Sequence, residues 1–147
     1  SPAHESHFTS AMKIFIDSPL LGAGPNNFRN LCSYEEFYQD TFSCSTHPHN
    51  TYIQLMVETG IIGTIPIISL FFYLIYLAFR QIMSFMKLSE QYFLSDHSVV
   101  FMIVMIINLW PIVPSLNFFN NWISILYFLP LGLLLSSEKF FKIKSSQ

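Results

Sequence analysis

The chain has 147 residues, of which 52% are hydrophobic, 17% are aromatic and only 11% are charged, and its formal net charge is −2. Soluble domains carry about 25% charged residues, so this composition argues against a soluble domain and predicts a membrane protein. The small negative charge gives no basis for binding nucleic acid. The opening residues, SPAHESHF, lack the basic and apolar regions of a signal peptide, and we expect the chain to be the C-terminal portion of a longer protein.

The first 59 residues are polar and acidic and are predicted to form a loop outside the membrane. An amphipathic helix that ends at Ser18, before Pro19, is expected near the start of this loop. Apolar residues recur there at helical intervals, at Phe8, Met12, Phe15 and Ile16. His4 and His7 share one face of the helix. We interpret them as marks of a helix at the membrane surface, with metal binding as the alternative.

The stretch LLGAGPNNFRN follows this helix. Gly22 and Gly24 allow positive φ, and Pro25 suits the first position of a short helix, which places Arg29 just after a glycine bend. A guanidinium is always charged and matches phosphate with two hydrogen bonds, and the backbone N–H groups of such a turn can hold an anion. The pattern therefore predicts an anion site, with a solvated loop arginine as the alternative.

Cys32 and Cys44 are the two cysteines of the chain, and both lie in the predicted outer loop. An even number of cysteines in an oxidising compartment indicates a disulfide. This bond would restrict the segment before His47 by up to about 3 kcal/mol. The alternative is a zinc site formed by both cysteines with His47 and His49, although the spacing follows no structural zinc pattern.

The segment HPHNTYIQ places two histidines directly before an apolar run. Asn50 or Thr51 can cap a helix, and Thr51 with Gln54 fits a capping box. His49 then lies at the N-terminal end of a long helix, where the helix dipole disfavours an imidazolium and leaves the neutral form that a general base requires. His47 is expected to point the same way if the segment is extended. The alternative is that both are ordinary polar residues at a membrane interface.

Three apolar segments follow. Residues 61–79 carry no charge, and about 20 apolar residues in a helix cross a bilayer core of about 30 Å, so this segment is predicted to span the membrane. The segments from about 99 to 113 and from about 122 to 135 are interpreted as a helical hairpin, because Pro111 and Pro114 disfavour a continuous helix. A re-entrant pair is the alternative.

Five of the seven Lys and Arg residues lie at 80–97 or 138–147. Such loops stay on the cytoplasmic side, so the first 59 residues and the 114–121 turn are predicted to face outward. The fold class expected is an all-α membrane protein, a fragment of a larger bundle in which short amphipathic helices precede about three transmembrane helices. The expected regions are outer loop 1–59, transmembrane helix 60–80, cytoplasmic loop 81–97, transmembrane hairpin 98–137 and cytoplasmic tail 138–147.

Two stretches, SPLLGAGPNNFR and HPHNTYIQLMVETGIIG, resemble in their order the signature of the O-antigen ligase and O-antigen polymerase family of bacterial inner-membrane proteins. The similarity covers about residues 8–70. It implies metal-independent, cofactor-free glycosyl transfer on the periplasmic face of the inner membrane, in lipopolysaccharide or other polysaccharide biosynthesis. The implied donor is a glycan on undecaprenyl diphosphate. The implied acceptor is a sugar hydroxyl, on lipid A–core for a ligase or on another glycan repeat for a polymerase.

By position, the resemblance gives His49 the role of the base that removes the acceptor proton, and Arg29 the role of holding the donor diphosphate, with the 1–59 loop as the catalytic loop. A fixed cation would stabilise the charge that develops on the leaving diphosphate. The family uses a further arginine in an earlier outward loop, so these 147 residues are not expected to be active alone. The other residues expected to bind the substrate are His47, Asn50, Gly22 and Gly24.

Two other classes of function stay open at this point. A proton-coupled transporter or flippase would relay protons through His47 and His49, and it would be expected to carry ionisable residues within its spans. The 61–79 segment has none. A non-catalytic membrane scaffold would leave the glycine-bend arginine and the HPHN segment as accidents.

Overall fold

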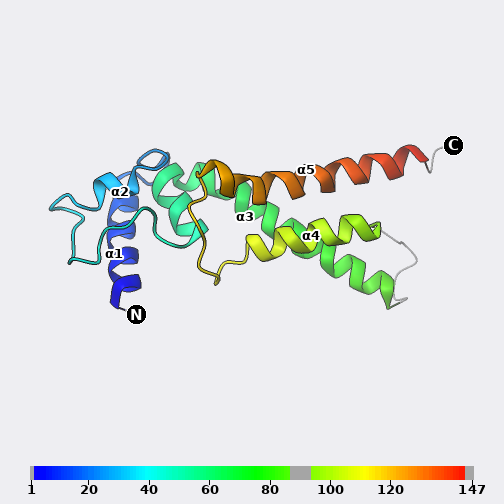
Figure 1. The fold of residues 1–147 in the computed structure, drawn as a ribbon, viewed down its shortest axis with the longest axis horizontal. Helices are drawn as coiled ribbons and strands as arrows, with labels where there is room; N and C mark the ends of the chain where they lie inside the picture. The colour runs from blue at the N-terminus through cyan, green and yellow to red at the C-terminus, as the bar shows by residue number, and fades with distance from the viewer. Residues whose placement is uncertain (1, 87–93, 145–147) are drawn as a thin grey trace. The chain divides into compact units, whose positions relative to one another are not determined.

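The computed structural model describes residues 2–86 and 94–144, with side chains described for 5–86 and 94–137. This part of the chain is helical and contains no strand (Figure 1). It divides into two compact units, and each is described by itself. Unit 1 comprises residues 1–68 and 111–123, and unit 2 comprises 69–110 and 124–147. The helices are α1 (Pro2–Asp17), α2 (Phe28–Leu31), α3 (Thr51–Phe85), α4 (Asp96–Asn108) and α5 (Asn121–Lys144).

Unit 1 has a small hydrophobic core between α1, α2 and the first turns of α3. Its buried members are Ala11, Ile14, Phe28, Cys32, Phe37 and Val57. The predicted helix at the start of the chain is confirmed, but its predicted apolar face is wrong in part, because Met12 and Ile16 are exposed. The buried face carries Ser6, Ser10, Ala11 and Ile14 instead. Ser10 is fully buried and donates a hydrogen bond of 2.8 Å to the Phe37 carbonyl, so this face packs against the loop after α2.

Helix α3 is interrupted at Gly60, whose φ of 65° and ψ of −168° are not helical. The break frees backbone groups, and the segment before α2 binds them. Ala23 N–H donates to the Val57 carbonyl (2.8 Å), and Gly24 N–H donates to the Glu58 carbonyl (3.0 Å). In return, the N–H groups of Ile61 and Ile62 donate to the carbonyls of Pro19 (2.9 Å) and Leu20 (3.2 Å). This interruption, around residues 57–62 of α3, is the strip on which the glycine turn packs.

Glycine is required on both sides of this strip. A Cβ on Gly22 would lie 2.5 Å from backbone atoms of Glu58, Thr59 and Gly60. A Cβ on Gly60 would lie 2.3 Å from the carbonyl oxygen of Leu20. Both glycines also have positive φ, which other residues adopt at a cost. The two sequence motifs are thus held together backbone against backbone.

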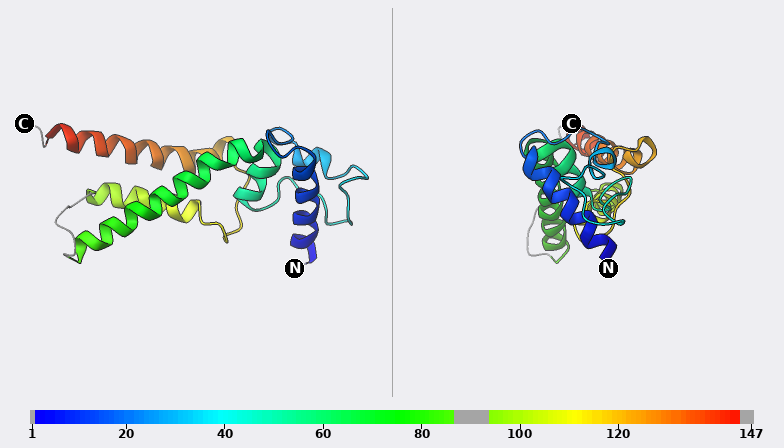
Figure 2. Two further views of the ribbon diagram at one scale, coloured as in Figure 1. Left: turned by 180° about the vertical axis from the view of Figure 1, so that it is seen from behind. Right: turned by 90° about the vertical axis from the view of Figure 1, so that its left-hand side faces the viewer.

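Unit 2 consists of the second part of α3, α4 and most of α5, which run alongside one another (Figures 1 and 2). Contacts at both ends show that α4 runs antiparallel to α3. Leu94 N–H donates to the Gln81 side chain (3.1 Å), while the rings of Phe71 and Trp110 lie 5.9 Å apart.

Helices α4 and α5 of unit 2 are also antiparallel. The hydroxyls of Ser98 and Ser137 lie 2.6 Å apart, and Asn108 donates to the Leu126 carbonyl (2.9 Å). This pairing agrees with the expected helical hairpin, and it gives Asn108 the helix–helix hydrogen bond that such a residue makes in membrane proteins.

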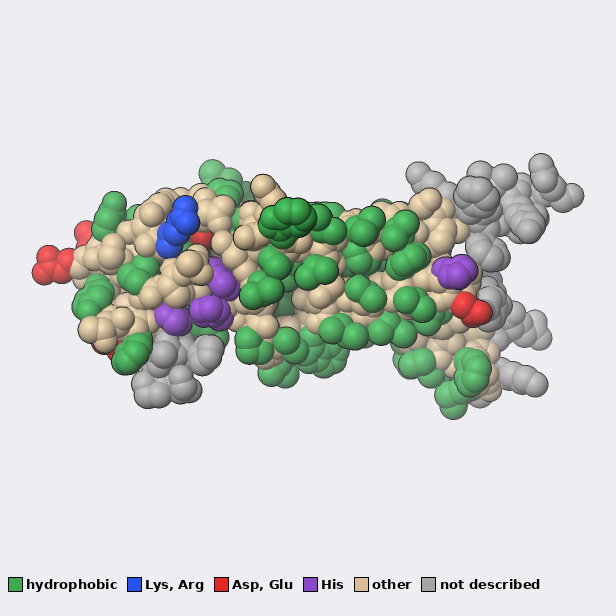
Figure 3. Space-filling view, viewed as in Figure 1, with side chains coloured by type: hydrophobic (Ala, Val, Ile, Leu, Met, Phe, Trp, Pro, Cys, Tyr) green, Lys and Arg blue, Asp and Glu red, His purple; other side chains and the backbone are tan. Residues whose placement is uncertain are grey.

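One described helix, α3, is long and apolar enough to cross a membrane by length and composition, and α4 and residues 121–137 are shorter apolar helices. Large apolar side chains of unit 2 face outward (Figure 3). Exposed apolar surface of this extent needs a cover of lipid or protein. With the low charge content, these features indicate a membrane protein. The number of spans and their orientation stay predictions, and the predicted loop 81–97 lies partly outside the described residues. Examples of exposed side chains are Phe72, Phe79, Ile82, Ile103, Ile107, Phe128 and Leu129.

Candidate active site

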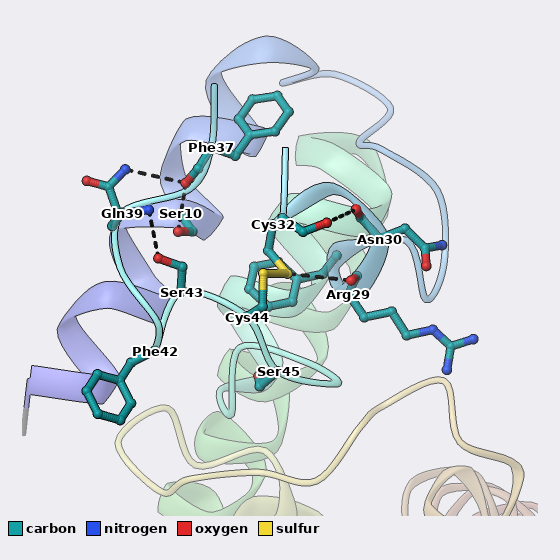
Figure 4. The surroundings of a disulfide bond; sticks show 12 residues. Ser10, Arg29, Asn30, Cys32, Phe37, Gln39, Phe42, Ser43, Cys44 and Ser45 are labelled. Atoms are coloured by element: carbon teal, nitrogen blue, oxygen red, sulfur yellow. Dashed lines mark hydrogen bonds between the residues drawn. A yellow bond between two sulfur atoms is a disulfide. The ribbon is translucent and has the colours of Figure 1, made fainter. Parts of the chain in front are cut away.

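Arg29 lies on α2, and its position follows from the docked glycine turn. The neighbouring Phe28 is fully buried, and its N–H donates to Glu58 Oε1 (3.2 Å). This bond ties the start of α2 to α3, while the Arg29 side chain is exposed. Figure 4 shows the guanidinium extending away from the Cys32–Cys44 disulfide. Arg29 therefore presents an exposed cationic side chain, while the residue before it is anchored to α3.

Gly22 and Gly24, expected to bind substrate, also have a structural role in the packing of the turn on α3. The N–H of Gly22 donates to the Ser18 carbonyl (3.0 Å), and those of Ala23 and Gly24 donate to carbonyls of α3. These three donors are already used and have no hydrogen left for an anion. The turn positions Arg29 through its bonds to α3, and substrate binding by Gly22 and Gly24 stays a prediction.

A buried polar network continues from Glu58. Gln54 and Glu58 are both fully buried, and Gln54 Nε2 donates to Glu58 Oε2 (3.0 Å) and to Asn117 Oδ1 (2.7 Å). Gln54 Oε1 accepts from the Phe118 N–H (2.9 Å). Asn117 in turn donates to Asn26 Oδ1 (3.0 Å). One glutamine thus joins the turn before α2, the first turns of α3 and the segment before α5.

Helix α3 begins with Asn50 as its cap. Asn50 Oδ1 accepts hydrogen bonds from the N–H groups of Tyr52 (3.0 Å) and Ile53 (3.2 Å), and Asn50 Nδ2 donates to the Pro111 carbonyl (2.8 Å). The capping box of Thr51 with Gln54 is wrong, because the Gln54 side chain belongs to the buried network. Asn50, expected to bind substrate, has both polar atoms of its side chain engaged in the fold.

His47 is buried, with 5% of its surface exposed, and both ring nitrogens have partners. Nε2 lies 3.0 Å from the Ser115 carbonyl oxygen, which can only accept, so Nε2 carries the hydrogen. Nδ1 then accepts from the Thr46 hydroxyl at 2.9 Å. Burial lowers the pKa of His47, and the charge of nearby His7 acts in the same direction. His47 therefore anchors the segment after α4, and the substrate contact expected of it stays a prediction.

His49 lies beside this anchor at the N-terminal end of α3. Its φ of 57° is positive, which is uncommon for a residue other than glycine. Its carbonyl accepts from the Ser115 N–H (3.0 Å), so the backbone is held from the same segment as His47. The imidazole is only partly buried, and its ring centre lies 4.3 Å from that of His47. His49 thus has a fixed backbone and a ring that solvent can reach.

A third imidazole, that of His7, joins this cluster from α1. The ring centres of His7 and His49 lie 5.6 Å apart. The sequence interpretation placed His7 on a surface helix and missed this contact. No local pattern pairs the two residues, because the contact depends on how the loop after α2 packs on α1. His4, the other histidine of that interpretation, lies outside the residues with described side chains.

The loop after α2 is closed by a disulfide between Cys32 and Cys44, whose Cα atoms lie 5.3 Å apart (Figure 4). Within the loop, Ser43 Oγ accepts from the N–H groups of Gln39 and Asp40, both at 2.7 Å. Because the two sulfurs are bonded to each other, Cys32 and Cys44 cannot serve as ligands in the alternative zinc site with His47 and His49. Among the residues with described side chains, no group of three or more His, Cys, Asp or Glu residues is arranged to hold a metal ion.

Unit 1 therefore contains both residues to which the sequence assigned chemistry, Arg29 and His49. Figure 3 shows histidine side chains gathered on one face of this unit, with a cationic side chain on the same face. Whether the guanidinium and the imidazole contact one substrate stays a prediction.

Comparison with known proteins agrees with the motifs. Residues 5–68 match the family model described as O-antigen ligase. No curated protein and no solved structure gave a significant match. The matched range contains α1 from Glu5 onward, the glycine turn, α2, the disulfide loop and α3 through Ile68, so it includes both candidate site residues. The part of the chain that carries both motifs, residues 5–68, is therefore similar to the O-antigen ligase family, the family that the two motifs resemble.

Proposed function

We propose that the chain is part of a membrane enzyme that transfers a glycan from undecaprenyl diphosphate to a sugar hydroxyl at the periplasmic face of the inner membrane. The observation that carries this proposal is the interlock of the two motifs. It fixes the backbone beside a permanent cation, Arg29, and beside a solvent-accessible imidazole, His49, within one compact unit. The family match over the same residues supports the same reaction class.

His49 acts as the general base. Its imidazole removes the proton from the acceptor hydroxyl, and that oxygen forms the new bond to the anomeric carbon of the donor glycan. A general base must be unprotonated at the working pH. The neighbouring His47 holds a fixed position beside this ring, because both of its ring nitrogens have partners.

Arg29 stabilises the leaving group. As the bond between the anomeric carbon and the phosphate oxygen breaks, the electron pair goes to undecaprenyl diphosphate, whose charge the guanidinium neutralises. Two parallel hydrogen bonds to phosphate oxygens also orient the diphosphate. The exposure of Arg29 suits a donor whose diphosphate lies at the membrane surface while its polyprenyl tail stays in lipid. The reaction needs no metal ion and no cofactor, because the diphosphate linkage is already activated.

The test compares two histidine variants of the complete protein in cells that lack the native copy. His49→Ala should abolish glycan transfer while the protein still accumulates in the membrane. His97→Ala, which changes an exposed histidine of α4 in unit 2, should leave transfer intact. The readout is the surface glycan by gel electrophoresis. Wild-type glycan in the His49→Ala strain would remove the proposed role of the base.

Ligase and polymerase share this chemistry and differ in the acceptor. A strain that lacks the protein separates them through the glycan that accumulates. Long chains that stay linked to undecaprenyl diphosphate and are missing from lipid A–core indicate a ligase. Single repeats in place of long chains indicate a polymerase.

A further inference from the structure

An exposed apolar surface continues from the start of the predicted span onto the glycine turn before α2. Its members, called here the leucine–isoleucine patch, are Leu20 and Leu21 of the turn and Ile61, Ile62 and Ile65 of α3. All five belong to unit 1. The two leucines are among its most exposed residues, with 62% and 73% of their surfaces accessible. Exposed apolar surface of this kind needs a cover, and the surroundings of the patch indicate which one.

The turn and the span are joined at this patch through their backbones. The N–H groups of Ile61 and Ile62 donate to the carbonyls of Pro19 (2.9 Å) and Leu20 (3.2 Å). A Cβ on Gly60 would lie 2.6 Å from the backbone nitrogen of Leu21, so no side chain separates the two segments. Leu20 and Leu21 therefore lie level with residues 60–62 of α3. The uncharged segment predicted to span the membrane begins at Ile61, and the turn lies at the same depth as this start.

The backbone of the turn meets the condition that lipid imposes on irregular structure. Non-helical backbone is tolerated at membrane depth only where its polar groups have partners. The N–H groups of residues 22–24 donate to backbone carbonyls at 2.8–3.0 Å, and the carbonyls of Pro19 and Leu20 accept the two bonds from α3. These groups of the turn are thus paired within the protein, while the two leucine side chains face outward.

The charges on either side of the turn fit a short insertion. Residues 18–28 carry no charged side chain, whereas Asp17 before them and Arg29 after them are charged and exposed. Charged side chains are costly in hydrocarbon and stay at the head groups or in water. The disulfide loop differs, because its exposed residues include Glu35 and Glu36. Within unit 1, the glycine turn is therefore suited to lipid and the disulfide loop to water.

We propose that Leu20 and Leu21 insert among the lipid acyl chains beside the start of α3, so that the glycine turn anchors unit 1 to the membrane. The occupant of the patch is lipid because the patch is continuous with the exposed apolar face of the predicted span. The region 1–59, expected to lie wholly outside the membrane, would then enter it at this turn. The proposal concerns the position of the turn and does not depend on the proposed reaction.

The test measures the surroundings of a nitroxide label on the complete protein in vesicles of phosphatidylethanolamine and phosphatidylglycerol. Cys32 and Cys44 are bonded to each other and do not take the label, so Leu21→Cys is labelled in a background without other free cysteines. Oxygen, which concentrates in lipid, should relax this label more strongly than a water-soluble nickel chelate. The depth derived from the two agents should agree with that of a label on Ile62→Cys to within about 5 Å, one helical turn.

Two further label positions are the matched controls. Ile65→Cys, at an exposed residue within the predicted span, should report lipid, and Glu35→Cys, at an exposed residue of the disulfide loop, should report water. If Leu21→Cys does not accumulate, Leu20→Cys provides the same readout. A label on the turn that the nickel chelate relaxes more strongly than oxygen overturns the proposal. A label that neither agent reaches also overturns it, because protein then covers the patch.

A second measurement needs no label. Leu21 is exposed, so neither Leu21→Ala nor Leu21→Asp removes packing within unit 1. If the side chain lies in lipid, the carboxylate of Leu21→Asp must be drawn out of it, and the unfolding midpoint in bilayer nanodiscs should fall further than for Leu21→Ala. Equal midpoints contradict the lipid contact. Neither measurement requires glycan transfer, so failure of this proposal is distinct from failure of the proposed function.

Discussion

Each of the two units is stabilised internally by a different kind of interaction. Among the residues with described side chains, the buried polar or charged ones are Ser6, Ser10, Ser43, His47, Thr51, Gln54, Glu58 and Thr64 in unit 1, but Ser98 alone in unit 2. In unit 1, hydrogen bonds join segments that are distant in sequence, and backbones meet without side chains between them. In unit 2, three apolar helices are joined by a few polar contacts. The contrast indicates that unit 1 specifies positions, as an active site requires, while unit 2 mainly offers apolar surface to its surroundings.

The largest effect should come from the backbone contact of unit 1. In Gly60→Ala the new Cβ would lie 2.3 Å from the Leu20 carbonyl oxygen at a positive φ. We expect a loss of about 4 kcal/mol of stability, or no accumulation at all. Gly132→Ala in α5 is the matched control, because nothing lies within 4 Å of its Cβ position. It should change stability by less than about 1 kcal/mol, in the stabilising direction. Thermal unfolding in detergent measures both, and equal effects would break the contrast between the units.

A glutamine in each unit makes the comparison sharper. Gln54→Leu leaves the Glu58 carboxyl, Asn117 and the Phe118 N–H without the partner that joins them, and should cost about 3 kcal/mol. Gln81→Leu in unit 2 removes one bond to the Leu94 N–H and should cost about 1 kcal/mol. The measurement is the unfolding midpoint of each variant. A tolerated Gln54→Leu would show that the network does not determine the fold of unit 1.

Arg29 tests whether the rigid unit serves chemistry. Arg29→Ala and Arg29→Lys should both lower transfer by about 100-fold, with the unfolding midpoint unchanged because the side chain is exposed. Lysine keeps the charge but not the two-bonded geometry. Transfer rates of the purified variants with a lipid-linked donor measure the effect. Full activity with lysine would leave charge alone as the requirement.

Local features of the fold were predictable from the sequence, and contacts between distant segments were not. The helix at 61–79 and a cap at Asn50 follow from short-range patterns of apolar residues and amides. The engagement of His47 depends on Ser115, and the position of His7 depends on the loop that Ser6 and Ser10 hold. The residues that neighbour either histidine in the sequence do not predict these contacts.

For the glycines, too, the residue type predicted the local backbone conformation but not the segment that packs against it. A positive φ at Gly22 was expected from its residue type. Two further facts can be known only once the turn is seen to pack on α3. The N–H groups of the turn donate to backbone carbonyls, and the absence of a Cβ on Gly22 leaves room for the backbone of Gly60.

The disulfide loop gives a smaller effect, confined to unit 1. Replacing both Cys32 and Cys44 by Ser should cost up to about 3 kcal/mol, because the closed loop restricts the unfolded chain. Transfer should fall only as far as the segment before His47 loosens. Mass spectrometry of unreduced peptides should find the two cysteines in one linked product. Two free thiols in protein isolated from its native membrane would contradict the bond.

The smallest effect is the dependence of unit 1 stability on pH. Burial lowers the pKa of His47 from its ordinary value of about 6.5. The unfolded chain then binds a proton that the folded state rejects, so this contribution to stability is fully present above about pH 6.5 and is lost as the pH falls toward the lower folded value. The lowered pKa of Asp40 acts only at far lower pH, below its ordinary range. Unfolding midpoints at pH 7.5 and 5.5 should therefore fall further in the wild type than in His47→Gln, where an amide can still donate to Ser115. His97→Gln, at an exposed histidine of unit 2, should keep the wild-type difference, and the same slope in His47→Gln would show that His47 is not the group that senses the acid.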